Sequence, residues 1–239
     1  MTAATVPIAA SATTPNDHEI EVRTEWGPLL DVETRPRARV LQGAEAHYAH
    51  NGRLLSIEHV FSPAECERLV AAAEEFGFGK TNYPKSYRGN LRLITVDVSL
   101  AAAMWSRLQA LVPSTVELDG DEWRATGLNE CWRLAKYHPG DRFGVHCDAC
   151  FQRTPSEISM FTVNVYMNAV ADGGATRFYA EREKRDGKAS EPVMVVTPEP
   201  GLGVIFRQPP GEHLLHDGEA LGSGLKYLFR TDIMYRRSR

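Results

Sequence analysis

His146, Cys147 and Asp148 form a His-x-Asp triplet in the second half of the chain. In a strand, residues two positions apart point the same way, so the imidazole and the carboxylate would converge while Cys147 turns away. His216 follows much later, near the start of another predicted strand. Two histidines and one carboxylate on one face of a metal leave positions open, as in non-haem Fe(II) sites that activate oxygen. The triplet alone is a weak signal, because such triplets arise by chance and usually mark surface loops.

Other residues compete for these roles. His213 lies three positions before His216 and would face the opposite side of a strand, so both cannot bind one metal. The Leu-His-Asp-Gly context favours His216. Cys147 and Cys150 form a Cys-x-x-Cys, a pattern of zinc or redox sites. Because it interleaves with the proposed ligands, we interpret both cysteines as incidental, with Cys150 near the pocket. Zinc in the same His-His-carboxylate set is the other option.

The elements that must position these residues are short strands. Downstream of Leu128, runs with period-2 alternation are separated by Gly and Pro, a spacing typical of an all-β barrel or sandwich. The predicted runs are 130–137, 143–148, 158–168, 175–179, 193–197, 203–207, 213–216 and 225–235. Within the third run, strict alternation places Ile158, Met160, Thr162, Asn164 and Tyr166 on one face. It places Ser159, Phe161, Val163, Val165 and Met167 on the other.

Helices are expected upstream. Ser62 and Glu65, with Pro63 between them, predict a capping box at the start of a helix that ends near Gly77. A second helix is predicted from Ser99 to Pro113. The class is therefore α+β, mainly β. We divide the chain into an N-terminal arm at 1–50, partly disordered; a helical support region with pocket-mouth loops at 51–127; and a catalytic core at 128–239.

Composition narrows the class of protein. The 239 residues are 43% hydrophobic and 24% charged, with a formal net charge of -4, as in ordinary soluble domains. No basic surface indicates a nucleic-acid partner, and no apolar run approaches the roughly 20 residues that span a membrane. The Ala- and Thr-rich start lacks the features of a signal peptide. Four scattered cysteines do not form a disulfide scaffold, so a cytoplasmic location is expected. The oligomeric state stays open.

Several motifs occur in a fixed order between residues 128 and 235. They are Gly127-Leu128-Asn129-Glu130, Tyr137-x-x-Gly140-x-x-Phe143-x-x-His146-x-Asp148, Tyr166-Met167-Asn168, Gly173-Gly174-Ala175-Thr176-x-Phe178, Leu215-His216-Asp217-Gly218, Gly224-x-Lys226-Tyr227 and Arg230-Thr231-Asp232. Together they resemble the prolyl-hydroxylase-like branch of the iron(II)/2-oxoglutarate oxygenase superfamily. The resemblance implies a double-stranded β-helix (jelly roll) with supporting N-terminal helices, and Fe(II) held by His146, Asp148 and His216.

The resemblance also implies that 2-oxoglutarate chelates the iron and that its far carboxylate meets a buried cation. Lys226 lies at the family's usual offset from His216, whereas the guanidinium of Arg230, on the same strand face, can grip a carboxylate bidentately. The choice between the two stays open. Tyr137 is implied to hydrogen-bond this cosubstrate.

The implied reaction consumes O2, converts 2-oxoglutarate to succinate and carbon dioxide, and hydroxylates an unactivated C–H bond, with ascorbate as a supporting reductant. Related halogenases carry a small residue where Asp148 stands, so the intact carboxylate favours oxidation. Asn90, Arg92, Asn164 and Tyr166 are the candidate substrate contacts. We expect a small molecule or amino acid as substrate. The alternatives are a prolyl residue in a peptide or protein, and a non-catalytic cupin-like metal-binding module.

Overall fold

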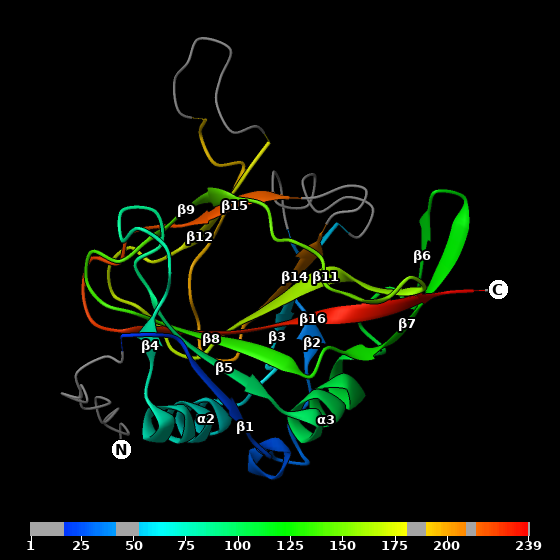
Figure 1. The fold of residues 1–239 in the computed structure, drawn as a ribbon, viewed down its shortest axis with the longest axis horizontal. Helices are drawn as coiled ribbons and strands as arrows, with labels where there is room; N and C mark the ends of the chain where they lie inside the picture. The colour runs from blue at the N-terminus through cyan, green and yellow to red at the C-terminus, as the bar shows by residue number, and fades with distance from the viewer. Residues whose placement is uncertain (1–16, 42–52, 181–189, 209–213, 239) are drawn as a thin grey trace.

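The computed structural model describes residues 17–41, 53–180, 190–208 and 214–238. Two β-sheets dominate the regular structure of this part of the chain (Figure 1). The helices lie along the outer side of the larger sheet, and the smaller sheet lies on its other side (Figure 1). The functional side chains described below come from both sheets.

The larger, 12-stranded sheet has a central path of eight strands. In spatial order they are β1 (Ile20–Arg23), β5 (Leu91–Val96), β8 (Cys131–Tyr137), β16 (Lys226–Arg237), β11 (Glu157–Tyr166), β14 (Gly203–Arg207), β3 (Leu54–Glu58) and β2 (Arg37–Ala38). Four more strands pair beside this path: β4 (Gly79–Lys80), β6 (Thr115–Leu118), β7 (Asp121–Leu128) and β10 (Gln152–Thr154). The 4-stranded sheet has the order β13 (Met194–Val196), β12 (Thr176–Tyr179), β15 (Leu215–Gly218) and β9 (Phe143–His146).

The predicted jelly roll is confirmed. Each run expected downstream of Leu128 contains one strand of the structure, from β8 through β9 and then β11 to β16. Strands far apart in sequence become neighbours, because β16 lies between β8 and β11 while β15 lies between β9 and β12. The two crossing connections bring the end of β9 beside β15, and this is what places His146 near His216.

The predicted facing of β11 is correct only in its second half. A β-bulge in the pairing with β16 adds one residue, Met160, between Ser159 and Phe161. Met160 and Phe161 both pack into the main hydrophobic core, whereas Ser159 and Thr162 both hydrogen-bond Gln208 on the opposite side. A bulge places two residues opposite one and so changes the phase of alternation. Strict alternation fails for this reason, and Met160 does not share a face with Thr162.

The first helix follows its prediction. Helix α2 (Pro63–Phe76) begins at Ser62, whose hydroxyl accepts from the backbone N–H of Glu65, while the Glu65 carboxylate accepts from the N–H of Ser62. This reciprocal pair is the predicted capping box. The helix buries Leu69, Val70 and Ala73 in the main core.

Helix α3 (Val98–Leu108) is shorter than predicted. Asp97, not Ser99, caps its start by accepting from the N–H of Leu100. Its last helical bond runs from Gln109 to Trp105, and the chain then turns before Pro113. Helices α2 and α3 are joined by a buried ion pair of 2.6 Å between Glu65 and Arg107. The two helices are therefore linked directly to each other as well as through the core.

The segment expected to supply helices and loops also supplies strands. β5 lies between β1 and β8, and β1 pairs with it in parallel. β6 and β7 form a hairpin whose second strand pairs with the end of β16. Strands upstream of residue 128 thus extend the same sheet as the predicted core. None of the helices that the structure describes is long and apolar enough to cross a membrane.

Candidate metal centre and adjoining pocket

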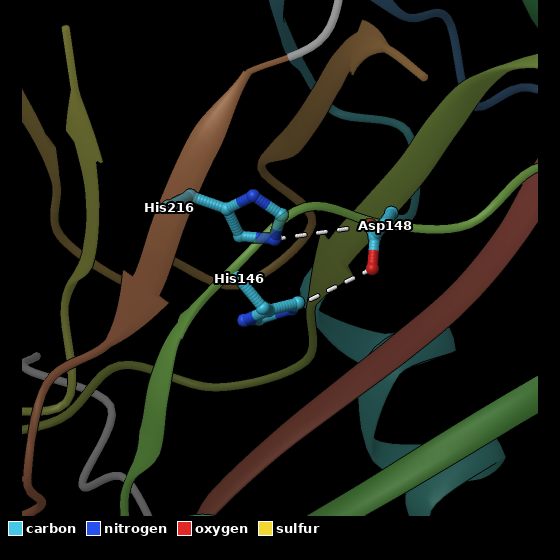
Figure 2. Close-up of side chains that lie close together, drawn as sticks. All are labelled: His146, Asp148 and His216. Atoms are coloured by element: carbon cyan, nitrogen blue, oxygen red, sulfur yellow. Dashed lines mark ion pairs between the residues drawn. The ribbon is translucent and has the colours of Figure 1, made fainter. Parts of the chain in front are cut away.

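Three side chains converge between the two sheets. His146 ends β9, His216 lies in β15, and the two are direct partners in the register of these strands. Asp148 lies two residues beyond β9, not inside a strand as the triplet predicted. One ligand atom from each residue lies within 4.8 Å of the others, and Figure 2 shows the side chains facing one another. The predicted metal ligands therefore come together although Asp148 is outside the strand.

Both imidazoles are held with Nε2 toward the centre. Nδ1 of His146 donates to the carbonyl of Gly144 at 2.8 Å, and Nδ1 of His216 donates to that of Leu214 at 3.0 Å. A proton on Nδ1 of a neutral ring leaves the lone pair of Nε2 free for a metal. Burial lowers the pKa of His216 to about 4, with Asp148 opposing the shift, so its ring is neutral at pH 7.

Aromatic rings fix the planes of these imidazoles. Phe143 stacks on His146 with ring centroids 3.7 Å apart. Phe206 and Phe178 pack against His216, with centroids at 4.7 and 5.6 Å. The Nε2 atoms of the two histidines lie 3.6 and 3.8 Å from the carboxylate oxygens of Asp148. Two nitrogen lone pairs and a carboxylate facing one another fit a cation between them.

Asp148 is ionised, and neighbouring side chains fix the orientation of its carboxylate. Burial acts to raise its pKa, but Arg230 and the two histidines together hold the pKa well below its ordinary value. Oδ2 accepts a 2.7 Å hydrogen bond from the Thr162 hydroxyl, which itself accepts from Gln208 at 2.7 Å. Oδ1 lies 3.0 Å from Nη1 of Arg230. The carboxylate orientation thus depends on contacts from β11 and β16.

A pocket opens beside the three side chains, with about 550 Å³ of space free of protein atoms, part of it open to solvent. Lys226 and Tyr137 line one part of it and are direct partners in the register of β16 and β8. Arg88, Arg92, Arg133 and Arg230 also line it. The pocket therefore contains the metal-ligand set together with two separate groups of cationic residues.

Lys226 is fully buried among groups suited to an anion. Its Nζ donates to the carbonyl of Gly174 at 2.6 Å and lies 5.0 Å from the centre of the Tyr137 ring. Thr176, also in the pocket wall, accepts from Tyr166 at 2.7 Å, which leaves its own proton free to donate. Burial lowers the pKa of Lys226 to about 8, while Asp217 and Glu219 oppose the shift. An ammonium with two unused protons, beside a hydroxyl donor, is suited to a carboxylate.

The four candidate substrate contacts lie in different environments. Arg92 and Asn164 line the pocket. Asn90 lines a neighbouring cavity instead, where its side chain donates to the carbonyl of Leu91 and accepts from Arg88. Tyr166 is fully buried and, as far as the described residues show, is absent from the pocket wall; it positions Thr176. Asn164 and Arg92 thus stay candidates for direct contact, and Asn90 and Tyr166 support residues that line the pocket.

Several site residues were missed. Thr176 stood inside the quoted Gly-Gly-Ala-Thr motif, and Thr162 shared the predicted inward face of Asn164, so both had a usable signal. Arg88, Arg133 and Gln208 had none, because their places depend on which strands become neighbours. Their positions are nevertheless central, since Gln208 links Thr162 to Asp232 through hydrogen bonds of 2.7 Å each.

Two alternatives have different outcomes. His213, the competing distal ligand, lies outside the described residues, as do residues 1–16 and 42–50 of the N-terminal arm. Cys150, expected near the pocket, is not among the described residues that line it.

Comparison with known proteins shows which solved structures have the same fold as this chain. No family model matches the sequence, and no curated protein matches it. Among solved structures, the viral collagen prolyl hydroxylase of Paramecium bursaria Chlorella virus-1, in its 2OG complex, aligns with a TM-score of 0.54 at 18% identity. The alignment covers 78% of this chain and 97% of that one.

A second solved structure agrees. A prolyl hydroxylase from Trichoplax adhaerens, in complex with a hypoxia inducible factor peptide fragment, aligns with a TM-score of 0.52 at 13% identity. This alignment covers 79% of this chain and 86% of that one. The chain has the prolyl-hydroxylase fold. The resemblance drawn from the motifs is thus confirmed for the fold.

Proposed function

We propose that this protein is an iron(II)- and 2-oxoglutarate-dependent dioxygenase that hydroxylates an unactivated C–H bond of a small molecule or amino acid. One observation carries the proposal: the facing ligand atoms of His146, Asp148 and His216 share a pocket with the buried ammonium of Lys226. A hydrolytic metal site has no need for a buried cation at this position. A cosubstrate that binds the metal at one end and carries a carboxylate at the other does need one.

The chain's own residues would act as follows. His146, Asp148 and His216 hold iron(II), which supplies the oxygen chemistry when bound, at the expense of 2-oxoglutarate. Lys226 neutralises the far carboxylate of 2-oxoglutarate. Thr176 donates to the same carboxylate, and the Tyr137 hydroxyl adds a hydrogen bond. The cosubstrate is thereby fixed in a single orientation before O2 and substrate arrive.

Other residues of the site orient the imidazoles and shield the pocket from water. The aromatic rings of Phe143 and Phe206 pack against the imidazoles of His146 and His216, and would help to keep bulk water from a metal bound there. Leu134 and Leu228 add apolar wall to the pocket. A dry wall limits loss of a reactive species to side reactions with water.

Anaerobic titration tests the proposal. Addition of iron(II) and then 2-oxoglutarate should produce a visible charge-transfer band that needs both, and admission of oxygen should yield succinate. Asp148→Ala should abolish the band. A protein that binds iron but never forms the band would be a metal-binding module of the cupin-like kind, and the proposal would then be wrong. Activity of a zinc-loaded form without 2-oxoglutarate would indicate a hydrolase.

The substrate class is tested separately. Succinate formation is measured with free amino acids, small metabolites and proline-containing peptides, with ascorbate added as the expected supporting reductant. Stimulation by a free small molecule supports the proposal. Stimulation only by a peptide would show that this protein acts on a prolyl residue, as the alternative holds.

A further inference from the structure

We propose that Arg88, Arg92, Arg133 and Arg230, the arginine cluster, bind a carboxylate of the substrate, so that the substrate is a small carboxylic acid. The inference rests on the proposed function, because it takes this pocket as the active site. It adds a second anion site to the one that Lys226 provides for 2-oxoglutarate.

The cluster is built by neighbouring strands. Arg133 of β8 and Arg230 of β16 are direct partners, and Asn164 of β11 is the next partner of Arg230. Arg92 of β5 pairs with Ala135, two residues from Arg133, and therefore projects on the same face. All of these side chains line the pocket. Three guanidinium groups and one amide thus project from four adjacent strands into the same space.

Arg88 joins the cluster from the segment before β5 and reaches toward the metal centre. Its guanidinium carbon lies 4.4 Å from the centre of the Phe143 ring. Phe143 in turn stacks on His146, with 3.7 Å between the two ring centroids. Phe143 thus contacts both Arg88 and His146, a proposed iron ligand. An anion bound by Arg88 would therefore lie close enough to the metal centre to be part of the substrate.

The positive charge of the cluster is only partly balanced. Arg92 pairs with Glu19 at 3.0 Å, while Arg133 and Arg230 share Asp232 at 3.3 and 3.4 Å. The remaining carboxylate contact, from Arg230 to Asp148, involves a group that iron would also claim.

Arg88 has no such partner. Within the described ranges no carboxylate lies in ion-pair distance of Arg88, whose guanidinium donates only to Asn90 there. Burial and, to a smaller extent, the nearby charge of Arg92 lower its pKa to about 10. Like charges gathered in a partly buried space are unfavourable unless an anion is bound.

Unsatisfied donors indicate where the anion binds. The Nε atoms of Arg92 and Arg230 are buried and have no acceptor within the part of the chain described. A buried donor without a partner is costly, and a planar carboxylate is the acceptor that matches guanidinium geometry. Lys226 is not part of this site, because the proposed function assigns its free protons to the far carboxylate of 2-oxoglutarate, beside Gly174, Tyr137 and Tyr166.

Calorimetric titration tests the inference without turnover. Protein loaded with manganese(II), with and without 2-oxoglutarate, is titrated with free and N-acetylated amino acids, each paired with its carboxamide, and with methyl phosphate. At least one acid should bind, and its amide should bind about 10- to 100-fold more weakly. Equal binding of acid and amide, no binding by any acid, or tighter binding of methyl phosphate than of every acid would overturn the proposal.

Variants locate the site. Arg88→Gln and Arg133→Gln should each weaken binding of the acid about 10-fold or more while leaving 2-oxoglutarate affinity unchanged. Arg153→Gln is the matched control, because Arg153 pairs with Glu130 and Glu157 outside the pocket. The melting temperature of ligand-free Arg88→Gln should stay the same or rise. A fall would indicate a structural arginine, and unchanged affinity for the acid in both cluster variants would overturn the proposal.

The two proposals fail differently. If wild-type protein forms no band with iron(II) and 2-oxoglutarate, the oxygenase proposal is wrong. Discrimination between acid and amide that depends on Arg88 would then still support a carboxylate site. If the band forms and this discrimination is missing, the oxygenase proposal stands and the carboxylate site does not.

Discussion

Nη1 of Arg230 lies 3.0 Å from Oδ1 of Asp148, so this guanidinium is committed to the proposed metal carboxylate. Lys226, four residues earlier on the same strand, has its Nζ on the carbonyl of Gly174 and retains two unused protons. The sequence left both residues as candidates for the far carboxylate of 2-oxoglutarate. These contacts favour Lys226 for that role and leave Arg230 to the metal and the substrate.

Exchanging each cation should separate the two roles. Lys226→Met should weaken 2-oxoglutarate binding about 10- to 100-fold, because a charged hydrogen bond to a carboxylate is lost, and should leave metal affinity nearly unchanged. Arg230→Met should leave 2-oxoglutarate affinity nearly unchanged, because this guanidinium contacts Asp148. Calorimetry with manganese(II) and then with 2-oxoglutarate measures both constants. If Arg230→Met causes the greater loss of 2-oxoglutarate affinity, the assignment is wrong.

The affinity for 2-oxoglutarate should depend on pH. Burial sets the pKa of Lys226 near 8 in the free protein, so the ammonium that attracts the dianion is present below this pH and lost above it. Affinity should be greatest below the pKa and fall up to roughly tenfold for each pH unit above it. Lys226→Arg keeps its charge over this range and should bind with little pH dependence. A flat profile for the wild type would count against Lys226.

The hydroxyl behind Asp148 should matter for the metal. Thr162→Val removes the 2.7 Å hydrogen bond to Oδ2 with almost no change in shape, so metal affinity should fall about 10- to 100-fold. Thr95→Val is the matched control, since Thr95 is equally buried and hydrogen-bonds Thr24 away from the pocket. Competition with a metal-sensitive dye gives both constants. Equal losses in the two variants would show a general packing effect.

The buried ion pair between Glu65 of α2 and Arg107 of α3 should matter for stability alone. Arg107→Met would strand the fully buried Glu65 without its partner, and the free energy of unfolding should fall by about 3–5 kcal/mol. Arg68→Met removes an exposed pair with Asp31 and two hydrogen bonds to the carbonyl of Leu29, so its effect should be much smaller. Urea denaturation distinguishes the two variants. A small effect of Arg107→Met on the free energy of unfolding would contradict the proposed role of this ion pair.

The predictable part of this protein is what short-range patterns encode. Alternation and Gly/Pro punctuation located the strands from β8 to β16 except β10, and Ser62 with Glu65 located the start of α2. The His-x-Asp triplet was a weak signal by itself, and the ordered motifs around it, through the family resemblance, indicated a metal site at His146, Asp148 and His216. Such signals need only the neighbouring residues and the period of a strand or helix.

What escaped prediction depends on long-range neighbours. Arg133 lies beside Arg230 only because β8 pairs with β16, and Gln208 reaches Thr162 only because β14 pairs with β11. No local pattern marks such residues. The ambiguity between Lys226 and Arg230 had the same origin, since both lie on one strand face and differ only in what the surrounding strands place near them.

The bulge at Met160 gives β11 one residue more than the paired segment of β16. Ser159 and Thr162 face the same side, although three positions separate them, because Met160 takes up the extra step. Removing Met160 would leave the facing of every other residue unchanged, whereas removing Val163 with the bulge kept would turn Ser159 and Asn164 to opposite sides. Distant proteins of this fold can therefore differ in length at this point and keep the same polar face, and an alignment of this strand should admit a gap here and nowhere else along it.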